Sequence, residues 1–295
     1  MSANKKSKFS RVAKIAVAFG AVLLIILAFT AYTYYQLYFK PNVAVKEEYL
    51  YIRTGSTFDE VMKTLNENDF LNNELSFQSA AERMNYVTNV KPGRYKLTKG
   101  LGNRRLINML KAGNQEPVKL FFGSIRLKKD FAGKVSKVLE ADSLSLIRLL
   151  DSSAYIKQYG FDPETVYAMF IPNSYELYWN TSAAEFVDRM HKEYEKFWTE
   201  ERKSKAKTVG LTPVQVSVLA SIVDAEALHD DEMPTIAGLY LNRYRKGIRL
   251  QADPTVIFAT GDFTIRRVLN RHLRISSPYN TYLNAGLPPG PMMMP

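Results

Sequence analysis

An uninterrupted apolar run, residues 15–31 (IAVAFGAVLLIILAFTA), limits the fold of this chain more than any other feature. Extended by Val12, Ala13 and Lys14, whose long side chain can carry its charge to the interface, it is long enough to cross most of a bilayer core. Basic residues precede it and aromatic residues follow it: Lys5, Lys6, Lys8, Arg11 and Lys14, then Tyr32, Tyr34, Tyr35, Tyr38 and Phe39. Because bases stay on the cytoplasmic side and aromatic rings favour the interface, we expect a single-pass anchor at 12–35, with residues 1–11 in the cytoplasm and the remainder outside.

A cleaved signal peptide is the alternative for this segment. No small-x-small cleavage site precedes the cluster of tyrosines, so the sequence favours an anchor that is not cleaved. Residues 36–46, which include Pro41, are expected to form a short link beside the membrane.

Charge and composition exclude several classes of protein. The formal net charge is +11, and the five bases before the apolar run supply +5 of it. The remaining excess suits an anionic polymer or a membrane surface as well as a nucleic acid, and no nucleic-acid-binding module accompanies it, so no nucleic-acid partner is expected. Because the chain contains no cysteine, disulfides, thiolate catalysis and cysteine-based metal centres are excluded.

Residues 47–115 are expected to form a small α+β module. Its expected elements are a strand at 49–53, a turn and helix cap at 54–56, helices at 58–65 and 75–84, a strand at 94–97, and a helix at 103–110 ended by Gly113. Strands and helices in this order, within about 65 residues, suit one compact unit.

Residues 116–295 are expected to form a larger α+β domain. Its first expected elements are a strand at 117–122, two amphipathic helices within 127–150 separated by a cap at Asp142, and an outer helix at 184–198. Residues 170–179 (FIPNSYELYW) interleave aromatic side chains with Asn173 and Glu176. This composition suits a glycan groove, with Asn173 as a contact, and it suits a core loop around Trp179 equally well.

Residues 211–226 (LTPVQVSVLASIVDAE) predict a short apolar helix that ends in a carboxylic acid. Thr212 and Pro213 mark its start, because a hydroxyl caps free N–H groups and proline is tolerated in the first turn. The stripe expected to face the core, at spacings of three and four, consists of Val216, Leu219, Val223 and Glu226. Asp224 points to a different side of the helix.

Glu226 continues an apolar stripe, and this placement would change its acidity. Desolvation disfavours the charged form of a carboxyl group, so we expect a raised pKa for Glu226 and a role as general acid near neutral pH. A glutamate near a helix end is otherwise an ordinary solvated residue. The segments that follow decide between these interpretations.

A further helix is expected from about residue 234 to residue 246, stopped by Gly247 and capped by Asp231 or Glu232. Several residues nearby could be interpreted as metal ligands: His229, Asp230, Asp231 and Asp253. Adjacent side chains diverge along a backbone and no paired histidine spacing appears, so we interpret these residues as capping and solvated groups and expect no metal.

Four segments resemble the YceG-like endolytic murein transglycosylases, the MltG family. They are ASIVDAE (220–226), LNRYRKGIRLQADPTV (241–256), SPYNTY (277–282) and GLPPGP (286–291), in the family's order. Four separate segments are far more specific than ASIVDAE alone. Together with the anchor and a region similar to the LysM-like domain of bacterial wall enzymes, the resemblance covers nearly the whole chain.

The resemblance assigns the family's catalytic glutamate to Glu226. It implies a lyase that cleaves β-1,4 bonds between N-acetylmuramic acid and N-acetylglucosamine in nascent peptidoglycan, leaving 1,6-anhydro ends and so terminating or trimming glycan strands. Ordinary glycosidases need a second carboxylate. Here the C6 hydroxyl of the sugar would attack C1, while Glu226 gives a proton to the leaving oxygen and then takes one from that hydroxyl, so no cofactor is needed.

Other site residues are candidates because of their type and their membership of the matching segments. Many relatives carry Glu where this chain has Asp224, which marks a supporting position. The remaining candidates are Gln251, Asp253 and Thr255, to position the acid or the sugars, and Tyr279, Asn280 and Tyr282, to line subsites. The turn at 288–290 is expected to shape the cleft.

The resemblance also implies a location and partners. The chain would lie in the bacterial cytoplasmic membrane with its catalytic domain in the periplasm, acting on peptidoglycan strands beside peptidoglycan synthases. The LysM-like module would either bind glycans that contain N-acetylglucosamine or set the distance from the membrane.

The C-terminal end differs from the family's pattern. Relatives continue beyond the turn at 288–290, whereas this chain ends MMMP at 292–295. We therefore expect a catalytic domain that is incomplete at its C-terminus. A cleft without one wall would be wetter, which would move the pKa of Glu226 back towards its ordinary value.

Two other functions fit the same residues. A non-catalytic peptidoglycan-binding scaffold of the wall-synthesis machinery would bind glycan strands without cleaving them. A metal-dependent hydrolase built on the acidic cluster would respond to chelators.

Overall fold

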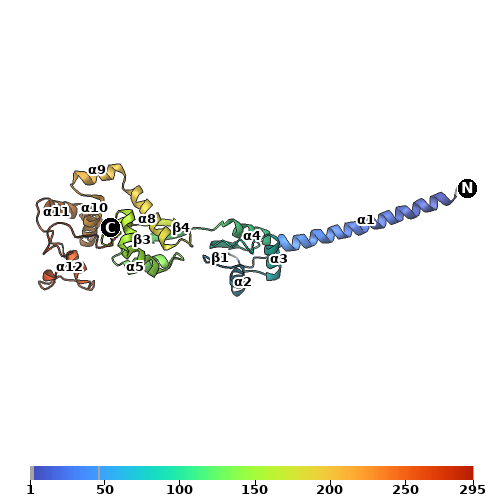
Figure 1. The fold of residues 1–295 in the computed structure, drawn as a ribbon, viewed down its shortest axis with the longest axis horizontal. Helices are drawn as coiled ribbons and strands as arrows, with labels where there is room; N and C mark the ends of the chain where they lie inside the picture. Colours follow the sequence, from blue (N-terminus) through green and yellow to red (C-terminus); the bar gives the residue numbers. More distant parts are fainter. Residues whose placement is uncertain (1–2, 46, 295) are drawn as a thin grey trace. The chain divides into compact units, whose positions relative to one another are not determined.

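The computed structural model describes residues 3–45 and 47–294, with side chains for 12–45 and 48–294. The chain forms two compact units, Met1–Pro117 and Val118–Pro295 (Figure 1). Helices predominate in both units, and each unit contains a two-stranded antiparallel sheet, β1 with β2 and β3 with β4. The coarse prediction of an α+β chain is confirmed.

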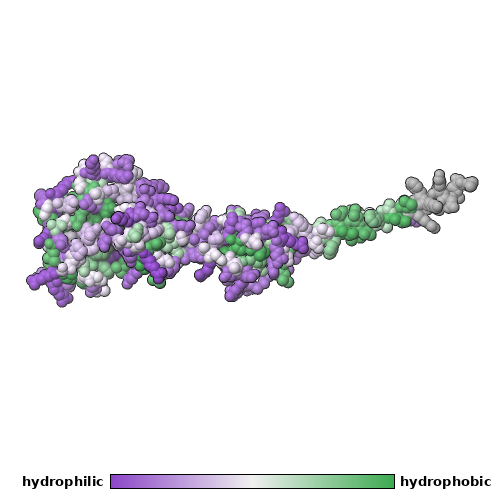
Figure 2. Space-filling model, in the orientation of Figure 1, coloured by the Kyte–Doolittle hydropathy of each residue, from purple (hydrophilic) through white to green (hydrophobic). Residues whose placement is uncertain are grey.

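The first unit begins with the long helix α1 (Ala3–Tyr38). Its section Val12–Tyr38 is long and apolar enough to cross a membrane, and none of its most apolar window is buried. Figure 2 shows this helix as an apolar rod that leads into a largely hydrophilic module. The predicted helix is confirmed, whereas Lys5, Lys6, Lys8 and Arg11 lie outside the residues whose side chains are described.

The module that follows has the predicted order of elements. They are β1 (Glu47–Ile52), α2 (Phe58–Glu67), α3 (Glu74–Arg83), β2 (Gly93–Thr98) and α4 (Asn103–Ala112). The cap of α2 was predicted at 54–56, but it is Thr57. The Thr57 hydroxyl accepts the backbone N–H of Glu60, and the Glu60 carboxylate accepts that of Thr57. This reciprocal pairing satisfies two N–H groups that the first turn would otherwise leave free.

Residues 36–45 pack as part of the module instead of forming a free link. Val43 is buried in its core. Asn42 and Asn103 are also buried, and the Asn42 Nδ2 donates to the Asn103 Oδ1 over 2.7 Å. The Asn103 Nδ2 donates to the backbone oxygen of Leu37 in α1 over 2.8 Å. The end of α1 is therefore fixed to the module by hydrogen bonds between buried amides.

The second unit contains the remaining elements. The strands are β3 (Val118–Phe122) and β4 (Asn173–Leu177); the helices are α5 (Lys128–Ser136), α6 (Ser143–Asp151), α7 (Ser153–Ile156), α8 (Ala183–Phe197), α9 (Glu200–Thr208), α10 (Pro213–Glu226), α11 (Met233–Arg245) and α12 (Asp253–Thr260); and short 3-10 turns lie at Lys157–Tyr159, Val166–Met169, Asp230–Glu232 and His272–Arg274. The strands and helices that were predicted are present. Neither α9 nor α12 was predicted.

Part of the segment 170–179 belongs to the core. Phe170, Tyr175 and Leu177 are buried, and Tyr175 lies opposite Leu120 in the pairing of β4 with β3. The Phe122 and Tyr175 rings stack with their centroids 5.3 Å apart. Phe170 and Tyr175 are therefore occupied in packing, whereas Tyr178 is 55% exposed, so a glycan contact by this segment stays a prediction.

The C-terminal segment of the described chain runs through the interior of the second unit. Met292 belongs to the apolar cluster around α10, and Met294 belongs to the cluster around β3, β4 and α8. The backbone N–H of Met292 donates to the Ser221 Oγ over 3.1 Å, and that of Met294 donates to the Ile125 oxygen over 3.1 Å. The segment therefore joins the two halves of this unit.

Gly290 lies where this segment passes the turn before residue 166, and a Cβ there would collide with the carbonyl oxygen of Glu164. We predict that Gly290→Ala destabilises the second unit by roughly 1–3 kcal/mol, since packed backbone cannot yield easily. Urea unfolding followed by tryptophan fluorescence reports on this unit alone, because both tryptophans, Trp179 and Trp198, lie in it.

Gly238 in α11 is the matched control for this substitution, because a Cβ there meets no atom within 4 Å. Alanine is the better helix former, so Gly238→Ala is expected to stabilise the protein by up to about 1 kcal/mol. Equal unfolding midpoints for Gly290→Ala and the unsubstituted chain would show that the segment is not closely packed.

Candidate active site

Helix α10 starts and ends where the sequence predicted. The Thr212 hydroxyl accepts the Gln215 backbone N–H, the Gln215 side chain accepts that of Thr212, and Pro213 occupies the first turn. Six of the fourteen residues of the helix are buried, including Ser221 and Ile222, which have no exposed surface. The helix ends at Glu226, so an element with a buried middle delivers one carboxyl group at its last position.

The apolar stripe of α10 emerges at the surface in its last turn. Leu219 and Val223 are buried, whereas Glu226 as a whole residue is exposed. Asp224 faces a different side, as expected. It lines two apolar grooves along α10, of about 790 and 450 Å³, together with Val216 and Ala220. Neither of these two grooves is lined by Glu226.

Three side chains from separate segments surround Glu226. The Tyr240 hydroxyl, from α11, hydrogen-bonds to the Glu226 carboxylate. Asp253, the first residue of α12, brings a second carboxylate close enough to affect the acidity of Glu226. The Tyr282 hydroxyl donates to the Asp253 Oδ1 over 2.6 Å. We call these four residues the Glu226 cluster.

The pKa of Glu226 is raised above its ordinary value. Loss of water around the carboxyl group is the main cause, and the charge of Asp253 raises the pKa further, whereas the hydrogen bond from Tyr240 lowers it. Because the residue as a whole is exposed, this desolvation is partial and local to the carboxyl group. The direction agrees with the prediction made from the apolar stripe.

The two tyrosines of the cluster remain neutral donors. Burial, followed by the neighbouring Glu226, raises the pKa of Tyr240. Burial, followed by the hydrogen bond to Asp253, raises the pKa of Tyr282 to about 12. At neutral pH both hydroxyls therefore keep their protons and can stabilise negative charge on the two carboxylates.

Buried hydroxyls hold together the two segments that supply Asp253 and Tyr282. The Thr255 and Thr281 Oγ1 atoms lie 2.8 Å apart in a hydrogen bond, and the Thr281 Oγ1 accepts the Ala252 backbone N–H over 3.0 Å. Thr255 has no exposed surface. Its hydroxyl therefore joins the start of α12 to the segment that carries Tyr282.

Asn280 and Tyr279 also have structural partners. The buried Asn280 donates from its Nδ2 to the oxygens of Leu273 and Ile275 and accepts the Tyr282 backbone N–H, so it orders the loop that carries Tyr282. The half-buried Tyr279 packs on Phe258, with ring centroids 4.6 Å apart. Asn280 is not available to line a subsite in this structure.

Gln251 occupies a left-handed backbone conformation, with φ 52°, just before α12. Its Oε1 accepts a hydrogen bond from the Arg243 guanidinium, and the Arg243 Nε donates to the Arg249 oxygen over 2.8 Å. These bonds hold the turn between α11 and α12. Asn173 lies at the exposed start of β4, where its Oδ1 accepts the Ser174 N–H, and no described contact joins it to the Glu226 cluster.

Tyr240 was missed by the sequence analysis. It lies on the face of α11 that also carries Ile236 and Tyr244, at the spacing of a buried stripe, and it is itself 5% exposed. A tyrosine in such a stripe needs a partner for its hydroxyl, and the carboxylate at the end of the neighbouring helix is one. The need of a buried tyrosine hydroxyl for a hydrogen-bond partner was therefore the feature of the sequence that pointed to Tyr240 as a site residue.

The acidic segment after Glu226 is used in local capping. The Glu232 carboxylate accepts the backbone N–H groups of Leu228 and His229 over 3.0 and 3.3 Å. Glu232 is the N-cap residue of α11, as predicted, but its side chain makes no capping hydrogen bond to that helix. Among the described residues, no group of three histidine or acidic side chains is placed to hold a metal ion.

These features define an α+β protein whose second unit presents a partly desolvated glutamate, beside an aspartate and two tyrosines, at the end of an apolar helix. The chain belongs to the YceG-like family, whose profile matches residues 50–295.

Two individual relatives support membership of this family. The endolytic murein transglycosylase of Bacillus subtilis (strain 168) is 28% identical over 257 residues, which cover 82% of this chain and 71% of the relative. That of Streptococcus pneumoniae serotype 2 (strain D39) is 24% identical over 282 residues, covering 83% of this chain and 49% of the relative. This chain thus spans about half the length of the pneumococcal protein.

A solved structure has the same fold. The crystal structure of a YceG-like protein from Listeria monocytogenes matches with a TM-score of 0.52 and 25% identity, over 84% of this chain and 86% of that one.

Two substitutions should move the pKa of Glu226 in opposite directions. Asp253→Asn removes a charge that raises it, so the pKa should fall; Tyr240→Phe removes a hydrogen bond that lowers it, so the pKa should rise. The measurement is an NMR titration of the full chain labelled with ¹³C at glutamate carboxyls, with the Glu226 signal assigned from its loss in Glu226→Gln.

Glu200→Gln on α9 is the control for this titration, because Glu200 is paired with Lys203 on the surface and is absent from the Glu226 cluster. It should leave the Glu226 titration unchanged. Shifts of the same sign in Asp253→Asn and Tyr240→Phe would contradict the arrangement described above.

Proposed function

We propose that this chain is a membrane-anchored endolytic peptidoglycan lytic transglycosylase with Glu226 as its catalytic acid and base. The observation that carries the proposal is the position of Glu226 at the end of α10, beside Tyr240 and Asp253, where loss of water raises its pKa; all three residues lie in the region that the family profile matches. The two relatives named above are themselves called endolytic murein transglycosylases.

The proposed reaction needs one carboxyl group that is protonated when the substrate binds. Glu226 gives its proton to the oxygen that links C1 of N-acetylmuramic acid to the next sugar, and that C1–O bond breaks. The C6 hydroxyl oxygen of the same sugar bonds to C1, and its proton passes to the Glu226 carboxylate. The result is a 1,6-anhydro end with no consumption of water, and Glu226 returns to its protonated form.

The neighbours of Glu226 support this cycle. A raised pKa increases the protonated fraction near neutral pH, which the first step requires. In this proposal the Asp253 carboxylate, which accepts the Tyr282 hydroxyl, favours the positive charge that develops on the sugar ring. The Tyr240 hydroxyl stabilises the Glu226 carboxylate formed after the proton has left.

The location follows from α1 and from the substrate. The exposed apolar surface of α1 supports a single span, with the N-terminus in the cytoplasm and residues from about 40 onward outside. Peptidoglycan lies on that outer side. We propose residues 116–295 as the catalytic domain, residues 47–115 as a LysM-like module that binds glycan or acts as a spacer, and peptidoglycan synthases as partners.

A non-catalytic peptidoglycan-binding scaffold is the second candidate. The observation that favours it is the exposure of Glu226, together with the placement of Asp224, and not Glu226, in the two apolar grooves beside α10. Such a protein would bind glycan strands and leave them intact.

Glu226→Gln tests the proposal, because the amide keeps the size of the side chain and cannot exchange the proton. The full chain in detergent should release 1,6-anhydro products from nascent peptidoglycan, and Glu226→Gln should lower the rate by roughly 10²- to 10⁴-fold. Mass spectrometry of the released fragments is the measurement.

The same change at an exposed glutamate, Glu200→Gln, should leave the rate within about twofold of the unsubstituted chain, as expected for a surface pair. Glycan binding without any 1,6-anhydro product from the unsubstituted chain would favour the scaffold. Unchanged activity in Glu226→Gln would remove Glu226 from the chemistry.

A further inference from the structure

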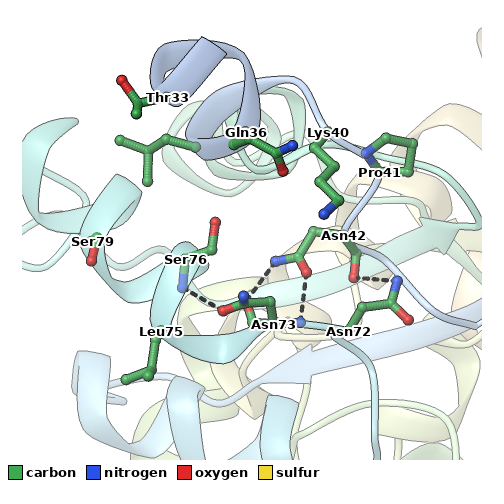
Figure 3. Close-up of a pocket in the computed structure, with 11 residues that line it drawn as sticks. Thr33, Gln36, Lys40, Pro41, Asn42, Asn72, Asn73, Leu75, Ser76 and Ser79 are labelled. Atoms are coloured by element: carbon green, nitrogen blue, oxygen red, sulfur yellow. Dashed lines mark hydrogen bonds between the residues drawn. The ribbon is translucent and has the colours of Figure 1, made fainter. Parts of the chain in front are cut away.

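A polar pocket of about 570 Å³ lies in the first unit where α1 meets the module (Figure 3). We call it the juxtamembrane pocket. Its walls are Thr33, Gln36, Leu37, Lys40, Pro41, Asn42, Asn72, Asn73, Leu75, Ser76 and Ser79. In Figure 3 the Lys40 side chain, just after the end of α1, extends towards Asn42, and the Gln36 amide from α1 lies beside it.

The position of the pocket along α1 matches the headgroup layer of a bilayer. A hydrocarbon core takes about 20 helical residues, so a span that starts at Val12 ends near Ala31. Thr33 and Gln36 then lie roughly 3 and 8 Å further along the helix axis, at a rise of 1.5 Å per residue. The headgroup layer is roughly 5 to 8 Å deep on each side. The pocket therefore opens at the depth of lipid phosphates.

The pocket has one formal charge and several free hydrogen-bond donors. Lys40 is its only charged lining residue, and neither Lys40 nor Gln36 makes a side-chain hydrogen bond or ion pair with another residue whose side chain is described. The Ser76 Oγ accepts from the Asn103 Nδ2, which leaves its own proton free to donate. The Asn73 Oδ1 accepts the Ser76 N–H, and its Nδ2 remains a donor. Such a set of donors around an ammonium group suits a phosphate ester.

The floor of the pocket is fixed before any ligand arrives. The buried Asn42 donates to the Asn103 Oδ1 over 2.7 Å and to the Asn73 oxygen over 2.8 Å, and its own Oδ1 accepts the Asn73 N–H over 2.7 Å. Since Asn103 also bonds to the Leu37 oxygen, both walls are held by one network. A site whose walls are already ordered loses less conformational entropy when it binds.

Apolar groups flank the polar ones on the same pocket. Leu75, at the start of α3, is 75% exposed. It lines the pocket together with Leu37 of α1. An exposed leucine is unfavourable in water, but it matches the first carbons of a lipid acyl chain. The pocket thus combines phosphate donors with an apolar edge.

We propose that the juxtamembrane pocket binds the phosphodiester headgroup of an anionic phospholipid from the leaflet in which α1 ends. Lys40 and Gln36 donate to the phosphate oxygens, Ser76 and Asn73 donate from the module side, and Leu75 contacts the acyl chain. The inference rests on the membrane anchoring proposed above, and it does not depend on the reaction at Glu226.

The test uses the full chain in nanodiscs that contain equal amounts of phosphatidylglycerol and phosphatidylcholine. Native mass spectrometry, after transfer to mild detergent, counts the lipids that stay bound. The unsubstituted chain should retain phosphatidylglycerol in preference to phosphatidylcholine. Lys40→Gln should lower that preference roughly tenfold, as expected for the loss of a charge-assisted hydrogen bond.

Two further variants distinguish lipid binding in the pocket from general attraction of anionic lipid to a basic surface. Gln36→Leu leaves the net charge unchanged and should also lower the preference several-fold. Arg104, which lies over the Phe39 ring with 5.5 Å between its Cζ and the ring centroid, is a cation at the same end of α1 but outside the pocket lining. Arg104→Gln should keep the preference within about twofold, since a single surface charge contributes little on its own.

Several results would overturn the proposal. Equal losses in Lys40→Gln and Arg104→Gln would indicate only a charged surface, and no lipid preference in the unsubstituted chain would indicate no site. Displacement of the lipid by low-millimolar inorganic phosphate would identify a soluble ligand instead of a headgroup. Circular dichroism confirms that each variant is folded, and retained 1,6-anhydro release by the variants distinguishes a failure here from a failure at Glu226.

Discussion

Helix α10 is packed against α9, α11, α12 and the turn at Val166–Met169, and this packing fixes where its last residue can lie. Ser221 and Ile222, in its middle, have no exposed surface, and the Met292 backbone binds to the Ser221 hydroxyl. A helix held on so many sides cannot rotate without opening the core. Its terminal carboxyl group therefore meets Tyr240 and Asp253 in one geometry, although it lies at the surface.

Some residues near Glu226 lie beside its carboxyl group, and others hold those residues in place. Asp253 and Tyr282 meet through one hydrogen bond, while Thr255 and Thr281 join their segments from the interior. Hydrogen bonds in such a buried setting are costly to break, because each partner would remain without a replacement. The site thus depends on residues that act on it only through the backbone they order.

The sequence predicted the elements whose signal is local. The start of α10 at Thr212 and the order of strands and helices in the module follow from caps and periodicity. Helix α9 carries almost no apolar residues, and α12 is only eight residues long, so neither shows an apolar period long enough to recognise. The stripe of α11 signals that the Tyr240 hydroxyl needs a partner, but it does not identify Glu226, because the two residues become neighbours only when α10 and α11 pack. Burial of Asn280 likewise depends on the tertiary fold of its loop.

The amide network between Asn42, Asn103 and the end of α1 has a mechanical consequence. A domain on a loose tether can swivel about the end of the helix that carries it, and it samples many orientations. Here the module is joined to α1 by buried hydrogen bonds on either side of Pro41, so the two move together. Each group on the module therefore keeps a nearly constant distance from the end of α1, and any reorientation of that helix turns the module by the same angle.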